Sequence, residues 1–163
     1  MTSRDLRELL LALNAHEVEY LIVGGYAVGV HSEPRATKDL DIFIRADEKN
    51  SKAVYRALAA FGAPIADLTP QDFNDSSSST FQVGMPPHRA DLLQSIDGVS
   101  FDEAWRSRTE ALLDGDIPVH VISREHLIRN KLASARSQDI ADVEAIRKAE
   151  STAKKLKRSK GDQ

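Results

Sequence analysis

The segment 39–44 (DLDIFI) constrains the fold most, because it places Asp39 and Asp41 in an otherwise apolar run. Alternation of this kind predicts a β-strand, in which residues i and i+2 point to the same face about 7 Å apart. Aspartate is disfavoured in strands, and two carboxylates on one face repel each other. A divalent cation such as Mg²⁺, which prefers carboxylate and phosphate oxygens, removes that conflict. The alternative is a strand end at which both carboxylates meet solvent.

Two glycines, Gly24 and Gly25, separate a predicted strand at 19–23 (EYLIV) from a predicted helix at 26–31. Glycine lets the backbone turn sharply and approach a phosphate closely, and the first turn of a helix offers free N–H groups. A tight turn without a ligand is the alternative. Adjacent strands would bring this turn and the acidic strand to the same edge of a sheet, where the glycines would bind phosphate.

A third aspartate, Asp91, lies near the start of another predicted strand at 89–94. If this strand neighbours the acidic strand, Asp91 joins Asp39 and Asp41, and three carboxylates can hold two Mg²⁺ ions. One ion would orient a triphosphate and the other would activate an attacking hydroxyl, with Asp91 as ligand and proton acceptor. The alternative for Asp91 is a surface or capping residue.

The remaining segments alternate between helical and extended patterns, and 66–79 is the least regular of them. This order predicts an α/β or α+β domain with a mixed sheet covered by helices. The periodicity and the capping residues predict helices at 3–16, 47–61, 101–108, 124–136 and 138–149, and strands at 80–83, 110–113 and 117–122.

Composition excludes several classes of protein. The 163-residue chain has no cysteine, which excludes disulfides and thiolate metal sites. No apolar run approaches the roughly 20 residues of a membrane-spanning helix, and the N-terminus lacks a signal-peptide cleavage site, so we expect a cytoplasmic protein without a membrane partner.

The net charge of −3 is unevenly spread, because 151–163 carries +4 and leaves −7 for the rest of the chain. An acidic body argues against broad nucleic-acid binding by the folded domain. We expect 151–163 to be a disordered, solvated tail; the alternative is a contact with RNA or an acidic partner.

The order of the motifs resembles the DNA polymerase β-like nucleotidyltransferase superfamily. Segments 24–41, 81–93 and 101–105 are similar to small bacterial members, including lincosamide-type antibiotic nucleotidyltransferases and the nucleotidyltransferase toxins of abortive-infection systems. The resemblance runs from about residue 5 to 148. It implies the nucleotidyltransferase fold, with a catalytic core at 1–122 and a short C-terminal helical segment at 123–150 packed on it.

The resemblance also implies transfer of a nucleoside monophosphate from a Mg²⁺-bound triphosphate, with ATP favoured, to a hydroxyl acceptor, and release of pyrophosphate. In the family a glycine turn holds the triphosphate, paired aspartates bind the metal, and a third aspartate acts as base. Many members have serine as the second residue of the glycine motif, where this chain has Gly25. Carried over to this sequence, these roles fall on Gly24, Gly25, Asp39, Asp41 and Asp91.

Three basic residues, Arg35, Lys38 and Lys131, are expected to neutralise the charge of the triphosphate. Stabilisation of a leaving pyrophosphate needs cations of this kind. A surface salt bridge is the alternative for each of them.

Two other interpretations remain open. The chain could be a weak or inactive nucleotidyltransferase-fold partner in a toxin–antitoxin pair, which its small size and basic tail favour and its three aspartates oppose. A metal-dependent phosphoesterase is less favoured because of the glycine turn before the acidic strand. The acceptor, whether a small molecule, a tRNA end or a protein side chain, is left undetermined.

Overall fold

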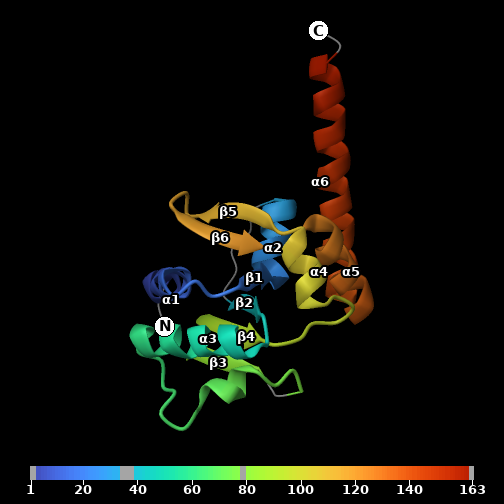
Figure 1. Cartoon of the computed structure of the whole chain (residues 1–163). Coiled ribbons are helices and arrows are strands. Elements are labelled where there is room, and N and C mark those ends of the chain that lie inside the picture. The colour runs from blue at the N-terminus through green and yellow to red at the C-terminus, as the bar shows by residue number, and fades with distance from the viewer. Residues whose placement is uncertain (1–2, 34–38, 78–79, 162–163) are drawn as a thin grey trace.

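A six-stranded mixed sheet forms the centre of the molecule (Figure 1). The structure is a computed structural model and describes residues 3–33, 39–77 and 80–161. The strands are β1 (Tyr20–Val23), β2 (Asp39–Ile44), β3 (Phe81–Met85), β4 (His88–Leu93), β5 (Thr109–Leu113) and β6 (Ile117–Val121). Their order is β3-β4-β2-β1-β6-β5. β2 runs parallel to β4 and β1 parallel to β6, whereas the other neighbouring strands are antiparallel.

Helices cover both faces of this sheet, as the sequence predicted. They are α1 (Ser3–Ala15), α2 (Gly24–His31), α3 (Glu48–Phe61), α4 (Phe101–Arg106), α5 (Arg124–Ser134) and α6 (Ser137–Gly161), with a short 3₁₀ turn η1 (Pro70–Phe73) inside the segment expected to be irregular. α1, α3 and η1 pack together, and α2, α5 and α6 form a second group.

Side chains alternate along β2, so one set faces α1 and α3 and the other set faces α2, α5 and α6. Leu40, Ile42 and Ile44 are buried and share one face. Tyr20, the cross-strand partner of Ile44, donates its hydroxyl hydrogen bond to Asn14 of α1. The apolar face of β2 therefore packs against α1 and α3, which leaves the face carrying the aspartates to the second group of helices.

Four helices end at other residues than the sequence predicted: α1 ends one residue early, α4 and α5 end two residues early, and α6 is much longer. α5 ends at Ser134 because Ala135 adopts a left-handed conformation with φ 54°. The sequence predicted that the last helix ends near 149 and that 151–163 is disordered, but α6 continues as a helix to Gly161.

Residues 151–161 are helical in the structure, whereas the expectation of a disordered tail treated charge as a sign of disorder. Lysine, arginine, alanine and leucine are good helix formers, and cations near the C-terminus favour the helix dipole. Lys154 also pairs with Glu150 one turn earlier, at 3.3 Å between Nζ and Oε1. Figure 1 shows this exposed end of α6 projecting from the body in red. None of the described helices combines the length and apolar character needed to cross a membrane.

Candidate active site

Two of the predicted site residues are directly opposite each other on parallel strands. β2 pairs with β4 in a register that sets Asp41 beside Asp91 and Asp39 beside Arg89. Because side chains directly opposite in a sheet share a face, Asp39, Asp41 and Asp91 lie on one face, together with Arg89. Asp91 is buried, whereas the Asp39 side chain is 44% exposed. The structure therefore sets all three aspartates on one face of two neighbouring parallel strands.

The glycine turn lies against the same carboxylates. β1 pairs with β2 so that Val23 faces Asp41, and α2 starts at the next residue, Gly24. Gly24 has φ +65°, and a Cβ atom built on it would lie 2.1 Å from Oδ2 of Asp41. The sequence predicted that glycine is needed here for the approach of a phosphate. The structure shows a separate reason: any side chain at position 24 would occupy the space of the Asp41 carboxylate.

The carboxylate of Asp41 is in an unfavourable place for a negative charge. Burial raises its pKa, and the neighbouring charges of Asp91 and Asp39 raise it further, against the opposing effect of Lys131 and Arg89. Both effects disfavour the ionised form. A cation bound beside Asp41 would relieve the repulsion, and carboxylate oxygens are donors of the type that Mg²⁺ prefers.

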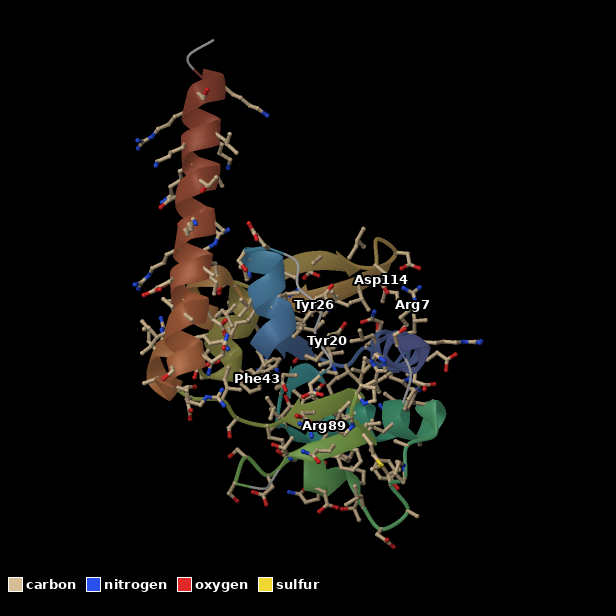
Figure 2. The ribbon with its side chains drawn as sticks, turned by 180° about the vertical axis from the view of Figure 1, so that it is seen from behind. Arg7, Tyr20, Tyr26, Phe43, Arg89 and Asp114 are labelled. Atoms are coloured by element: carbon tan, nitrogen blue, oxygen red, sulfur yellow. The ribbon has the colours of Figure 1, made fainter. Side chains whose placement is uncertain are left out.

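Arg89 is the residue of this site that sequence reasoning missed. Its Nε lies 3.0 Å from Oδ1 of Asp91, and its Nη2 lies 3.6 Å from Oδ2 of Asp39. Nη2 also donates a hydrogen bond to Oδ2 of Asp91 at 3.2 Å. Figure 2 labels Arg89 among the green strands in the lower half of the view. Its position two residues before Asp91, hence on the same face of β4, was the available signal.

The three aspartates are not arranged as a ready-made metal cage. Within residues 3–33, 39–77 and 80–161, no three acidic or histidine side chains stand close enough together to hold a metal ion. The guanidinium of Arg89 instead lies against two of the three carboxylates.

A cleft of about 480 Å³ opens beside Asp41 and the glycine turn. Its volume is within the range of sites that bind small molecules. Apolar side chains from the end of β4 and beyond form one side, and polar side chains of α5 and α6 form the other. The lining residues are Val23, Gly24, Gly25, Asp41, Leu93, Ile96, Asn130, Lys131, Ser134, Arg136, Gln138, Asp139 and Asp142.

Lys131 lies in the wall of this cleft, where it is held by two acidic residues of α6. Its Nζ is 3.2 Å from Oδ1 of Asp139 and 3.1 Å from Oδ2 of Asp142, and all three residues are buried. Arg136 donates to the other oxygen of Asp139 at 2.9 Å. Burial alone would raise the pKa of Asp139, but the hydrogen bonds from Arg136 and Lys131 outweigh it and hold this pKa below its usual range.

Of the three basic residues predicted to contact a triphosphate, the structure therefore places Lys131 at the cleft. Arg35 and Lys38 lie outside the described residues. The sequence had not predicted that Lys131 would be part of a buried ion cluster, because the spacing of Asp139 and Asp142 along α6 does not reveal the angle between α5 and α6.

Comparison with solved structures shows the fold. The lincomycin-bound crystal structure of the lincosamide antibiotic adenylyltransferase LnuA is 17% identical, with 90% of this chain and 97% of that chain covered and a TM-score of 0.56. ANT(2")-Ia in complex with adenylyl-2"-tobramycin is 16% identical over 89% and 88%, with a TM-score of 0.58. A nucleotidyltransferase-like protein from Paracoccidioides brasiliensis is 19% identical over 87% and 74%, with a TM-score of 0.50.

Sequence comparison assigns the family. No curated protein matches the chain. Residues 3–153, which include every element from α1 to most of α6, match the profile of a family described as a nucleotidyltransferase of unknown function, DUF6036. Because this profile covers nearly the whole chain, the chain belongs to the DUF6036 family of nucleotidyltransferases.

Proposed function

We propose that this nucleotidyltransferase moves a nucleoside monophosphate from a Mg²⁺-bound triphosphate to a hydroxyl acceptor and releases pyrophosphate. One observation carries the proposal: Asp41 and Asp91 are register partners on one face of the sheet, beside Gly24, where a Cβ atom would meet the Asp41 carboxylate. Folding alone gives no reason to gather three carboxylates on one face of two neighbouring strands, since their mutual repulsion opposes it.

Asp39, Asp41 and Asp91 are the residues that would hold the metal. When bound, a divalent cation supplies positive charge that neutralises the carboxylates and the phosphate oxygens together. Gly24 and Gly25 line the cleft at the start of α2, and the free backbone N–H groups of a helix N-terminus suit a phosphate.

Asp91 is the proposed proton acceptor. In the transfer step the acceptor oxygen forms a bond to the α-phosphorus, the bond from that phosphorus to the pyrophosphate oxygen breaks, and the hydroxyl proton moves to Asp91. ATP is the first donor to test, because LnuA is an adenylyltransferase and ANT(2")-Ia holds an adenylylated product. The antibiotic ligands of these two proteins support a small molecule as the acceptor. A tRNA end and a protein side chain are the other acceptors to be tested.

The test uses triphosphates labelled at the α or the γ position, incubated with the protein, Mg²⁺ and candidate acceptors. Transfer is expected to attach the α label to the acceptor and to release pyrophosphate. Release of inorganic phosphate without a labelled acceptor would indicate a phosphoesterase instead. Failure of every triphosphate to bind would contradict the proposal, and an Asp91→Asn variant is the matched negative control.

A second candidate function is binding of a partner protein, as in a toxin–antitoxin pair. The observation that favours it is the end of α6, where residues 151–161 are exposed and Leu156 is 59% exposed among basic side chains. In a cellular assay of growth effects, full effect from a variant lacking Asp39 and Asp41 would support this function over catalysis.

Lys131→Gln is expected to weaken both the fold and triphosphate binding. The Lys131 ammonium pairs with Asp139 and Asp142, and Lys131 also lines the cleft in which a triphosphate would bind. Removing the cation from two buried carboxylates should lower the free energy of unfolding by about 3 kcal/mol. Binding of inorganic triphosphate, measured by calorimetry below the unfolding temperature, should weaken about tenfold.

The matched control for this variant is Lys52→Gln. Lys52 pairs with Glu48 on the exposed face of α3, and its side chain is 54% exposed. An exposed pair of this kind contributes at most about 1 kcal/mol. Equal effects of the two substitutions would rule out a special role for Lys131.

A further inference from the structure

Arg89 occupies the place of a cation within the aspartate site. Its guanidinium bridges Asp39 on β2 and Asp91 on β4, at 3.6 Å and 3.0 Å. A guanidinium is always charged and presents five donors in one plane, which suits it to hold two carboxylates at once. The positive charge also opposes the rise in the pKa of Asp41.

The contact between Arg89 and Asp91 is close but poorly aligned. Arg89 Nε and Asp91 Oδ1 are both buried, yet neither atom has a hydrogen-bond partner of good geometry among the described residues. The pair is therefore held by coulombic attraction and by one hydrogen bond, from Arg89 Nη2 to Asp91 Oδ2 at 3.2 Å, without the two parallel hydrogen bonds of an optimal arginine–carboxylate pair. Replacing the guanidinium of Arg89 by another cation at Asp91 should therefore cost little free energy.

We propose that Arg89 is a positioning residue that substitutes for the divalent cation: it holds Asp39 and Asp91 together before metal binds, and it must release at least one of them when metal binds. This inference rests on the proposed metal-dependent function. Arg89 lowers the affinity of the site for metal, because the incoming cation competes with a charge already present. When metal is absent, the positive charge of Arg89 reduces the repulsion among the three carboxylates and so keeps the two strands paired at the site.

The test measures Mn²⁺ binding to the full chain without nucleotide, by the loss of the free Mn²⁺ signal in electron paramagnetic resonance. Arg89→Gln is expected to bind Mn²⁺ about tenfold more tightly than the wild type, since a unit charge a few ångströms from the metal is removed. In EDTA the same variant should unfold at a lower temperature than the wild type, and Mn²⁺ should raise that temperature by more than it does for the wild type.

Arg7→Gln is the matched control, because Arg7 also bridges two aspartates. It pairs with Asp114 at 2.9 Å and Asp116 at 2.7 Å, and Figure 2 shows Arg7 and Asp114 together at a distance from Arg89. Its Mn²⁺ affinity should equal that of the wild type.

A second variant, Arg89→Lys, guards against misfolding of Arg89→Gln. Lysine keeps the charge on a flexible chain that cannot bridge two carboxylates in a fixed plane, so its Mn²⁺ affinity should lie between those of the wild type and Arg89→Gln. Tightest binding by the wild type, or equal binding by all variants, would overturn the role of Arg89 alone. No Mn²⁺ binding by any of them would overturn the proposed metal-dependent function as well.

Discussion

Asp41→Asn is expected to reduce the rate of nucleotide transfer by roughly 10³-fold or more, and yet to raise the melting temperature of the metal-free protein at pH 7. The first effect follows because asparagine removes a charged oxygen donor from the metal site, where several kcal/mol of transition-state stabilisation originate. The second follows because the ionised Asp41 is partly buried beside two other carboxylates. The kcat/KM of transfer and thermal unfolding in EDTA measure the two effects.

The pH dependence of this stabilisation has a definite sign. The pKa of Asp41 is raised in the folded state above its ordinary value of 3.8, so the folded protein binds this proton more tightly than the unfolded chain does. Ionisation of Asp41 therefore lowers stability as the pH rises through the folded pKa. The advantage of asparagine should be full above that pKa and should disappear below the ordinary value.

Asp139→Asn is the matched control, because it is expected to lower the melting temperature where Asp41→Asn raises it. The pKa of Asp139 is held below its ordinary value by Arg136 and Lys131, despite burial. Its ionised form therefore stabilises the fold, and this contribution is lost as the pH falls through the folded pKa. At pH 7 this variant should lose about 3 kcal/mol of unfolding free energy. If Asp41→Asn lowered the melting temperature in the same way, the carboxylates would not be repelling one another.

The sequence sufficed to predict the acidic strand, the glycine turn and their convergence. Alternation placed Asp39 and Asp41 on one face, and the order of elements placed Asp91 on a neighbouring strand. These features are local, or they follow from which strands are adjacent. The register that makes Asp91 the partner of Asp41, and not of Asp39, is a property of the paired strands, so the structure was required to establish it.

The electrostatic partners could not be predicted from the chain alone. Arg89 was overlooked because a basic residue near the start of a strand is usually solvated, and only the pairing with β2 shows that it faces Asp39. The ion cluster of Lys131 depends on how α5 crosses α6. Contacts of this kind join side chains through tertiary packing, and their spacing in sequence carries little information about them.

Gly24→Ala is expected to damage both activity and stability, because the new methyl group would meet the catalytic carboxylate. The Cβ atom would lie 2.1 Å from Oδ2 of Asp41, far inside van der Waals contact, and φ is +65°. Backbone strain and overpacking together should lower the free energy of unfolding by about 3 kcal/mol. Displacement of Asp41 should reduce kcat/KM about 10²-fold or more. Chemical denaturation and the labelled-acceptor assay measure these losses.

Gly115→Ala separates the effect of backbone strain from the effect of steric contact with a neighbouring side chain. Gly115 has φ +79°, but a Cβ atom there would meet no atom within 4 Å. This variant should lose only about 1–2 kcal/mol, the part due to the left-handed backbone. In an Asp41→Ala background the loss caused by Gly24→Ala should be smaller than in the wild type, since the carboxylate is gone and only the Cβ of residue 41, at 3.1 Å, remains close to the methyl group. An equal loss from Gly24→Ala in both backgrounds would show that the glycine serves only its own backbone conformation, and that the turn and the acidic strand are not coupled.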